Sequence, residues 1–310
     1  MKKIFIDGKA GTTGLRIYER LENRKDIEII TLSEELRKDP EARRQAINSA
    51  DVVFLCLPDA ASIEAVAMVE NDKTVIIDTS TAHRTNPDWA YGFAELSEEF
   101  ENKIKNSKRI AVPGCHASGF IALVHPLIEA GILSKDALLT CHSITGYSGG
   151  GKKMIAEYEE EGRDTLLDAP RQYGVTQSHK HLKEMVKISG IENAPVFSPI
   201  VADFYSGMEV TVPLFGSMLK NGATIEDVKK LYAEKYNSEI VKYVEGSDED
   251  GFLSSVKLGG KDSMEISVHG NEERFVLVAR YDNLGKGASG AALECLNIVL
   301  GNEKTANLDI

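Results

Sequence analysis

In the N-terminal third of the chain, short apolar runs alternate with longer amphipathic stretches. Residues 40–49 begin with Pro40, which suits the first turn of a helix because no N–H is needed there. Strands that alternate with helices are typical of a parallel sheet, so residues 1–115 are predicted to form a doubly wound, Rossmann-type α/β domain. The β-branched runs predict strands at residues 3–7, 28–32, 51–57, 74–78 and 109–112, and the three- and four-residue apolar spacing predicts helices at residues 13–21, 40–49 and 60–69.

The pattern changes after Cys115. A helix is predicted at residues 117–130, and the segments that follow have fewer helices between them. Strands are predicted at residues 138–146, 195–202, 208–215, 263–269 and 274–281. Such a run of strands predicts an α+β domain with a mostly antiparallel sheet over residues 116–284. A helical pattern returns at residues 286–301, so residues 285–310 are expected to pack back on the first domain.

Composition fits an enzyme of two domains. The chain has 310 residues, of which 42% are hydrophobic and 27% charged, enough to bury a core and keep a hydrated surface. Its 36 basic and 48 acidic residues leave a net charge of -12, which argues against nucleic acid and anionic membranes as partners. We find no export signal at the N-terminus and no apolar stretch near the roughly 18 residues that span a bilayer.

The four cysteines, Cys56, Cys115, Cys141 and Cys295, are widely spaced and form no C-x-x-C pair. Neither a metal site nor a disulfide framework is therefore predicted, and a reducing cytoplasm is the expected location. Three of them lie in apolar contexts that suit small buried thiols. Cys115 differs, because it follows Gly114 and precedes small polar residues.

A glycine-rich loop follows the first predicted strand. Its spacing is G-x-x-G-x-x-G, and it stands where a strand meets the start of a helix. Backbone amides and the helix dipole can bind a pyrophosphate at such a junction, although a tight turn without a ligand is the alternative. The predicted contacts are Gly8, Gly11, Thr12, Thr13 and Gly14.

The choice between NAD and NADP depends on the end of the second strand. Ser33, Arg37 and Lys38 can hold a 2′-phosphate, whereas Glu34 and Glu35 suit a free ribose hydroxyl or simply face water. We therefore favour NADP as the cofactor, while a solvated charged loop remains the alternative.

Cys115 stands at the junction of a strand and a helix and is the candidate nucleophile. The positive end of the helix dipole favours a thiolate there, and free amides of the first turn can stabilise an oxyanion on the attacked carbonyl. His179 and His181 open a predicted helix, and Glu184 follows His181 by three residues, a spacing that lets a carboxylate orient the imidazole ring. His116 is a rival base that the helix is expected to point elsewhere, and a metal pair of His179 and His181 lacks a third ligand.

Six sequence blocks, in order along nearly the whole chain, closely resemble the N-acetyl-gamma-glutamyl-phosphate reductases in their shorter bacterial form. The longer form usually has Tyr-Pro-Thr after the cysteine, whereas this chain has His116-Ala117-Ser118, so details of the substrate site are not transferred between the forms. The blocks are Gly8 to Gly14, Asp78 to Arg84, Pro113 to Gly119, Gly146 to Lys152, Ser178 to His181 and Asp282 to Gly290.

The resemblance implies a member of the semialdehyde dehydrogenase group, with NADPH as reductant, Cys115 as nucleophile and His181 as acid and base. It places the segment from Asn283 to Gly290 near the nicotinamide and implies a homo-oligomer, a dimer or a tetramer. Further cofactor contacts are expected at Cys56, Leu57, Pro58, Ser80, Ser118, Asn283 and Gly287, and substrate contacts at Arg84, Ser148, Gly149 and His179. The planar guanidinium of Arg84 suits an acyl phosphate, with a surface arginine as the alternative.

The expected reaction is the NADPH-dependent reduction of N-acetyl-L-glutamyl 5-phosphate to the 5-semialdehyde through a thioester on Cys115, in arginine biosynthesis. Within the same class, aspartyl phosphate and a carrier-linked aminoadipyl phosphate are rival substrates. A cysteine hydrolase would leave the nucleotide-binding half without a purpose. A regulatory protein that binds NADPH without chemistry would show no unusual reactivity at Cys115.

Overall fold

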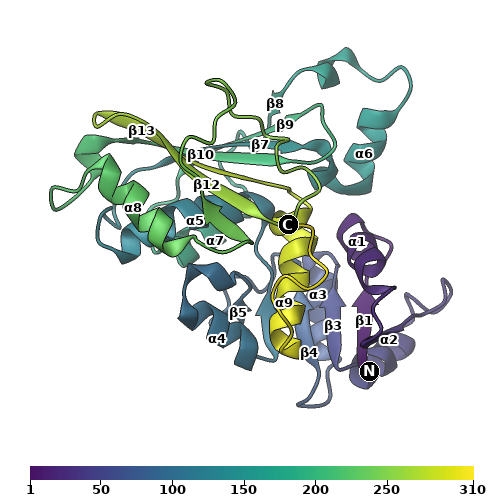
Figure 1. Cartoon of the computed structure of the whole chain (residues 1–310). Coiled ribbons are helices and arrows are strands. Elements are labelled where there is room, and N and C mark those ends of the chain that lie inside the picture. Colours follow the sequence, from purple (N-terminus) through teal and green to yellow (C-terminus); the bar gives the residue numbers. More distant parts are fainter. The chain divides into compact units, whose positions relative to one another are not determined.

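The computed structural model describes residues 1–310, and the chain divides into two compact units. Unit 1 comprises residues 1–113 and 288–308, and unit 2 comprises residues 114–287 with the last two residues of the chain. Figure 1 shows both units in the colours of the sequence. Each unit has its own sheet, so the two are described separately.

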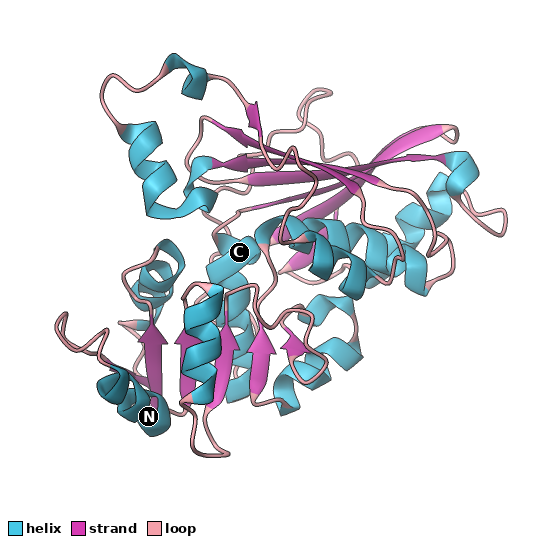
Figure 2. Ribbon diagram, turned by 180° about the vertical axis from the view of Figure 1, so that it is seen from behind, coloured by secondary structure: helices cyan, strands magenta, loops and turns pink.

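Unit 1 is built on a six-stranded sheet in which every neighbouring pair is parallel. Helices cover both faces of this sheet, whose strands are the parallel magenta arrows in the lower half of Figure 2. The strands follow the order β2 (Ile27–Ile30), β1 (Lys2–Asp7), β3 (Val52–Leu55), β4 (Val75–Asp78), β6 (Arg109–Ala111) and β5 (Ala90–Tyr91). The predicted Rossmann-type fold is confirmed.

Two apolar cores lie on the two faces of this sheet. Successive residues of a strand point to opposite faces, so Phe54 on β3 joins one core and Val53 the other. The first core is covered by α1 (Thr12–Leu21), α4 (Glu98–Asn106) and α9 (Gly290–Leu300), and the second by α2 (Pro40–Ser49) and α3 (Asp59–Ala67). Strands buried on both faces need continuous apolar runs, which explains why the pattern predicted them well.

Unit 2 is built on a seven-stranded sheet that is mostly antiparallel, as predicted. Two of its strand pairs, β11 with β12 and β7 with β9, are parallel. The strand order is β11 (Val241–Tyr243), β12 (Met264–Gly270), β13 (Arg274–Tyr281), β10 (Met208–Phe215), β7 (Thr140–Gly146), β9 (Val196–Ala202) and β8 (Arg171–Gln172).

Three helices of unit 2 form a layer on one face of its sheet. The central helix α5 (Cys115–Glu129) contacts β10 and β13, and it is also contacted by α7 (Leu182–Ser189) and α8 (Ile225–Lys235). Almost every residue of α5 is buried, which explains its nearly continuous apolar sequence. Shorter elements of the chain are α6 (Gly151–Glu159), four 3-10 turns, η1 (Ala94–Leu96), η2 (Tyr147–Gly150), η3 (Thr165–Asp168) and η4 (Gly216–Met218), and the π turn η5 (Gly285–Ser289).

Three helices were not predicted from the periodicity: α4, α6 and α8. Two of them carry a capping signal that could have identified them. The Ser97 side chain accepts a hydrogen bond from the Phe100 N–H at the start of α4, and Thr224 and Asp227 form a capping box on α8. In α4 the buried residue is Ile104, and α8 buries Ile225, Val228 and Tyr232, so few apolar positions mark either helix in the sequence.

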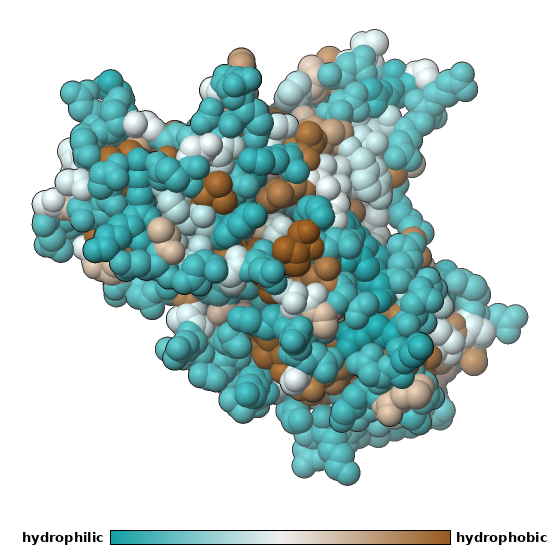
Figure 3. Space-filling model, viewed as in Figure 1, coloured by the Kyte–Doolittle hydropathy of each residue, from teal (hydrophilic) through white to brown (hydrophobic).

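The surface seen in Figure 3 is mostly hydrophilic, with apolar residues in separate patches. This agrees with the excess of acidic over basic residues in the sequence. None of the helices combines the length and the apolarity that crossing a membrane requires.

Candidate functional site

In the glycine loop between β1 and α1, backbone segments pass so close to one another that side chains would not fit between them. Gly8 has a φ of +89°, and a Cβ there would lie 2.2 Å from the carbonyl oxygen of Cys56. A Cβ on Gly14 would lie 2.5 Å from the Gly8 carbonyl oxygen. Only glycine fits at these two positions. Gly11 is the N-cap of α1 and supplies no side-chain cap, so the amides of Thr12, Thr13 and Gly14 begin the helix without a capping side chain.

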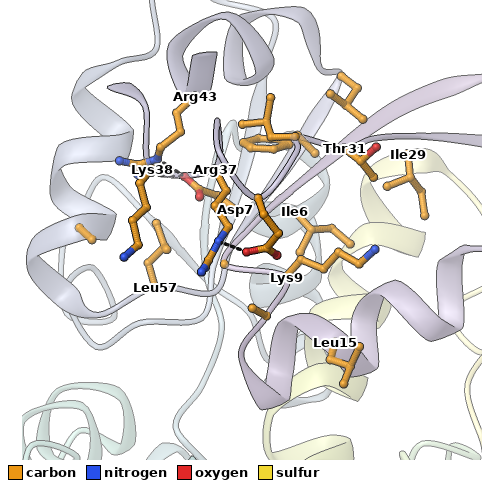
Figure 4. A pocket seen from close by; sticks show the side chains of 17 residues that line it. Ile6, Asp7, Lys9, Leu15, Ile29, Thr31, Arg37, Lys38, Arg43 and Leu57 are labelled. Atoms are coloured by element: carbon orange, nitrogen blue, oxygen red, sulfur yellow. Dashed lines mark hydrogen bonds and ion pairs between the residues drawn. The ribbon is translucent and has the colours of Figure 1, made fainter. Parts of the chain in front are cut away.

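A cavity of about 580 Å³ opens beside this loop in unit 1. Figure 4 shows side chains from β1, from the end of β2 and from the following loop around it. The cavity is lined by Phe5, Ile6, Asp7, Gly8, Lys9, Ala10, Leu15, Ile29, Ile30, Thr31, Leu32, Glu34, Arg37, Lys38, Arg43, Leu57 and Ala61. Its position at the carboxyl ends of β1 and β2 is where α/β sheets bind dinucleotides.

Four cationic side chains reach this cavity. Two of them are paired: Arg43 binds the buried Asp7 at 2.9 Å, and Arg37 binds Glu34 at 2.5 Å. Lys9 lies over the ring of Tyr18. The fourth, Lys38, pairs with no carboxylate and lies near Arg37 in Figure 4. Burial raises the pKa of Asp7, although the Arg43 guanidinium opposes that shift.

Further predicted cofactor contacts follow β2, β3 and β4. The Ser33 carbonyl accepts hydrogen bonds from the amides of Leu36 and Arg37, which turns the loop that carries Lys38. Leu57 lines the cavity and Pro58 is the N-cap of α3. Burial raises the pKa of the neighbouring Cys56 thiol to about 12, which makes it a poor nucleophile.

The loop after β4 is held by a buried carboxylate. Asp78 accepts hydrogen bonds from the hydroxyls of Ser62 and Ser80, and His83 Nδ1 lies 2.7 Å from its Oδ2. In the same loop, the buried Arg84 donates to the carbonyls of Val112 and Thr79 at 2.8 and 2.9 Å. Two donors of the Arg84 fork therefore bind backbone, and its contact with a phosphate stays a prediction.

Cys115 is the first residue of α5 in unit 2 and is only partly buried. Gly114 is the N-cap and provides no side-chain cap for the helix. The Gly287 backbone passes close by, because a Cβ on Gly287 would lie 3.0 Å from the Cβ of Cys115. Ser118 lies one turn further along α5, and its hydroxyl donates to the Gly114 carbonyl. The thiol therefore stands at a helix N-terminus beside a glycine that leaves it room.

His181 is the N-cap of α7, one residue before the helix begins. The predicted start of this helix at His179 is therefore wrong by a few residues. Glu184, in the first turn of α7, is buried, and its carboxylate accepts a hydrogen bond from the Gly114 N–H at 3.1 Å. This contact joins the first turn of α7 to the residue that precedes Cys115. The candidate acid and base therefore belongs to the same part of unit 2 as the candidate nucleophile.

Three histidine rings form one cluster in unit 2. The ring centroids of His116 lie 5.7 Å from those of both His179 and His181. His116 Nδ1 lies 2.7 Å from the Ser143 hydroxyl and Nε2 lies 2.5 Å from the Tyr173 hydroxyl. Burial, with the nearby charge of His179, lowers the pKa of His116 to about 3. Because it stays neutral, His116 is a poor proton acceptor at neutral pH, although its ring lies against those of His179 and His181.

The remaining predicted residues of unit 2 form a second hydrogen-bonded group. The Asn283 side chain donates to the Ser148 hydroxyl at 3.0 Å and accepts from the Gly207 N–H at 2.9 Å. A Cβ on Gly149 would lie 3.4 Å from the same Asn283 amide nitrogen, so Ser148, Gly149 and Asn283 are neighbours. The structure brings these residues together.

Tyr173, Asp282 and Tyr281 also belong to this site and were not predicted from the sequence. Asp282 accepts hydrogen bonds from the amides of Leu284, Gly285 and Gly260, which shapes the turn that leads to Gly287. It opened one of the sequence blocks and could have been noticed there. Tyr173 lies in a loop without periodicity, and Tyr281 ends a strand, so neither carried a signal in the sequence.

Two family models match consecutive parts of the chain. Residues 34–105 match the family model described as semialdehyde dehydrogenase, NAD binding domain. Residues 115–283, more than half of the chain, match the model described as semialdehyde dehydrogenase, dimerisation domain. The second match begins at Cys115.

Curated relatives cover almost the whole chain. N-acetyl-gamma-glutamyl-phosphate reductase of Sinorhizobium medicae is 45% identical over 96% of this chain and 98% of that protein. The protein of that name from Brucella ovis is 44% identical over 96% of this chain and 99% of its own length. N-acetyl-gamma-glutamyl-phosphate reductase 2 of Nostoc is 44% identical over 96% of this chain and 97% of that protein.

Solved structures of similar fold are more distant in sequence. Aspartate semialdehyde dehydrogenase II of Vibrio cholerae has a TM-score of 0.70 at 16% identity, covering 97% of this chain and 98% of that one. The enzyme from Francisella tularensis has a TM-score of 0.71 at 16% identity, covering 97% and 100%. The enzyme from Candida albicans, solved with NADP, has a TM-score of 0.64 at 16% identity, covering 99% of both chains. At this identity the likeness shows the fold alone.

Proposed function

Because the chain belongs to the N-acetyl-gamma-glutamyl-phosphate reductases, with both semialdehyde dehydrogenase domains, we propose that Cys115 carries the covalent chemistry of this reductase. The substrate is N-acetyl-L-glutamyl 5-phosphate and the product is the 5-semialdehyde, a reaction of arginine biosynthesis. The observation that carries the assignment of the nucleophile is the position of Cys115 as the first residue of α5, partly exposed and beside Gly287.

Unit 1 has the features that a nicotinamide dinucleotide needs. The close backbone approaches at Gly8 and Gly14 form a cradle that any Cβ would fill, and the cavity beside it holds Lys38 and Arg37. When bound, NADPH supplies the hydride that reduces the acyl carbon. Gly8, Gly11, Thr12, Thr13 and Gly14 would face the pyrophosphate, and Ser33, Arg37 and Lys38 the 2′-phosphate. The Candida albicans relative in fold was solved with NADP, which agrees with this cofactor.

The other predicted cofactor contacts fall in both units. Leu57 and Pro58, with Cys56 and Ser80, follow the strands of unit 1 whose ends line the dinucleotide site. Ser118, Asn283 and Gly287 belong to unit 2 and are neighbours of Cys115 or of the Asn283 group. We propose that unit 1, with α9, binds the cofactor and that unit 2 holds the reacting groups.

In the first step, the Cys115 thiolate attacks the carbonyl carbon of the acyl phosphate. A C–S bond forms, the C–O bond to phosphate breaks, and phosphate leaves with the electron pair, giving a thioester on Cys115. Phosphate is a good leaving group and needs little protonation. The amides of the first turn of α5, which have no side-chain cap, can stabilise the oxyanion that develops on the attacked carbonyl.

In the second step, the thioester carbonyl is reduced and a hemithioacetal forms on Cys115. His181 donates a proton to its oxyanion and takes the proton back as the C–S bond breaks. The aldehyde leaves and the Cys115 thiolate is regenerated. Glu184, through its hydrogen bond to Gly114, fixes the start of α5 against the turn that carries His181.

We assign substrate contacts to Arg84, Ser148, Gly149 and His179. Support differs among them: Ser148 and Gly149 are held by Asn283, and His179 borders the other two histidines. Arg84 is buried and donates to two backbone carbonyls, so we propose that it acts on the phosphate through its positive charge. Family membership favours this substrate over aspartyl phosphate, over carrier-linked aminoadipyl phosphate and over the amides or esters of a cysteine hydrolase.

The match to a dimerisation domain supports a homo-oligomer, and we propose a dimer or a tetramer. The cytoplasm is the proposed location, since the four widely spaced cysteines, all free thiols, suit a reducing compartment. A small-molecule acyl phosphate is the expected partner.

The reverse reaction tests the proposed function, because acyl phosphates hydrolyse readily. The enzyme is given N-acetylglutamate semialdehyde, phosphate and NADP⁺, and NADPH formation is followed by absorbance. Aspartate semialdehyde and NAD⁺ are the parallel controls. Phosphate-dependent NADPH formation with the acetylated substrate alone is the expected result. If another semialdehyde is the one that reacts, the substrate assignment is wrong. If none reacts, the reductase assignment is wrong, and a cysteine hydrolase or a regulatory protein that binds NADPH becomes the favoured function.

A further inference from the structure

The hydroxyl of Tyr281 enters the first turn of α5. It donates a hydrogen bond to the Cys115 carbonyl and accepts one from the Gly119 N–H at 3.0 Å. In a regular α-helix these two backbone groups, four residues apart, pair with each other. A side chain inserted between such groups opens the turn locally. The backbone of the candidate nucleophile is therefore held by a side chain from β13.

The fold is built to admit this hydroxyl. A Cβ on Gly119 would lie 2.7 Å from the Tyr281 oxygen and 2.7 Å from the Cβ of Val210, so only glycine leaves room. Tyr281 itself is fully buried at the end of β13, paired in register with Met208 on β10 and Met264 on β12. Two strands thus fix the position of its backbone, and the ring has little freedom to move away from α5.

Two other buried tyrosines also donate hydrogen bonds to carbonyls of α5, but these bonds lie near a proline within the helix. Pro126 lies inside α5 and has no N–H, so the Ala122 carbonyl lacks its usual partner. Tyr236 donates to that carbonyl at 2.7 Å, and Tyr232 donates to the next one, of Leu123. Tyr236 therefore satisfies the carbonyl that the proline leaves without its usual partner, and Tyr232 binds the carbonyl beside it. No proline explains the contact of Tyr281, because Gly119 has an N–H of its own.

We propose that Tyr281 is a positioning residue for Cys115: its hydroxyl fixes the first turn of α5 and thereby the direction of the thiol. This inference rests on the proposed function, in which Cys115 is the nucleophile. The hydroxyl does not touch the reacting atoms. It acts through the backbone of Cys115, whose carbonyl it binds, and so sets how the Sγ atom faces the substrate carbon.

The protonation of Tyr281 supports this role. Burial raises the pKa of the Tyr281 phenol well above its usual value, and the nearby Cys115 adds to the shift. The hydroxyl therefore keeps its proton throughout the working pH range and remains a donor to the Cys115 carbonyl. The hydrogen bond from Tyr281 to the Cys115 carbonyl is therefore expected to persist when the pH changes.

The test is Tyr281→Phe, which removes the hydroxyl and keeps the ring. The variant is expected to fold, because the Cys115 carbonyl and the Gly119 N–H can then pair with each other. That pairing turns the thiol, so kcat should fall about tenfold or more while the KM for the acyl phosphate changes less than about twofold. The rate of Cys115 alkylation by iodoacetamide, measured across pH, should fall in parallel. NADPH binding, followed by fluorescence, should be unchanged.

Tyr236→Phe is the matched control, since it removes the same group from the same helix away from Cys115. It leaves the Ala122 carbonyl without its donor, so it should lower Tm more than Tyr281→Phe does while keeping wild-type kcat and alkylation. The proposal is overturned if Tyr281→Phe retains kcat and alkylation within about twofold, or if it fails to fold. If iodoacetamide does not inactivate the wild type, the role of Cys115 itself is wrong, which is a separate result.

Discussion

The carboxylate of Glu184 accepts a hydrogen bond from the backbone N–H of Gly114, over 3.1 Å, in the buried interior of unit 2. Gly114 precedes Cys115, and Glu184 lies in the turn that follows His181. One contact therefore ties the segment that carries the nucleophile to the segment that carries the acid and base. The position of His181 relative to the intermediate that forms on Cys115, with whose oxygen it exchanges a proton, depends on this contact.

Glu184→Ala should lower both stability and activity. The buried Gly114 N–H then lacks its acceptor, which costs about 1–3 kcal/mol in the free energy of unfolding, and kcat should fall about tenfold as the two helix ends separate. Glu184→Gln keeps an oxygen that can accept this bond and should retain more of both quantities. Denaturant unfolding and steady-state kinetics measure the effects, with the exposed Glu192→Ala as control. Equal behaviour of Glu184→Ala and Glu192→Ala would refute the role of the contact.

His181→Asn should lower kcat by roughly 10²- to 10⁴-fold, the usual contribution of a general acid and base. His179→Asn and His116→Asn are the comparisons, because the three rings belong to one cluster. Steady-state rates in the reverse direction give the values. A loss of only about twofold in His181→Asn would transfer the role to His179 or to His116.

The buried His116 should make the protein less stable at acidic pH. Its pKa is about 3 in the folded chain and 6.5 in the unfolded chain, so below pH 6.5 the unfolded state takes up a proton that the folded state refuses. Stability is therefore lost as pH falls from 6.5 towards 3, by about 2 kcal/mol at pH 5. Chemical unfolding at pH 7 and pH 5 should show that His116→Asn loses about that much less than the wild type. Identical losses in the two proteins would contradict the low pKa.

Lys38→Ala should weaken NADPH binding selectively. Lys38 lines the cavity of unit 1 and pairs with no carboxylate, so it is ready to bind a 2′-phosphate. Its loss should raise the KM for NADPH about tenfold, equivalent to about 1.4 kcal/mol, and leave the weaker use of NADH unchanged. Arg37→Ala should have the smaller effect, because Arg37 binds Glu34 at 2.5 Å. A parallel loss with both cofactors would place Lys38 outside the phosphate site.

The sequence predicted those elements well whose side chains alternate or repeat without interruption. The bounds of β10, β13 and α2 agree with the residues predicted. Buried residues alternate along β10, β13 is an almost continuous buried run, and Pro40 marks the start of α2. Short helices with mainly polar surfaces, such as α6, bury too little to produce that signal. Their stability comes from caps and from tertiary packing.

The residues of the candidate site likewise fall into those that the sequence indicated and those that only the structure shows. The glycine loop and Cys115 are local features at a strand and helix junction, so the sequence indicated them directly. The contacts of Cys115 with Gly287 and Tyr281, and of Glu184 with Gly114, join segments that are far apart in the chain. Helical spacing placed Glu184 beside His181, but it could not show that the carboxylate reaches Gly114. Such contacts follow from the packing of α5 against α7 and β13, which no local pattern encodes.

The most direct test of the covalent mechanism is a reverse reaction without phosphate. The enzyme is mixed with N-acetylglutamate semialdehyde and NADP⁺, NADPH formation is followed by absorbance, and the protein mass is then measured. The account predicts a burst of one NADPH per subunit and one N-acetylglutamyl group on Cys115, released by added phosphate and absent in Cys115→Ser. Steady turnover without a burst, or an acyl group on another residue, would contradict it.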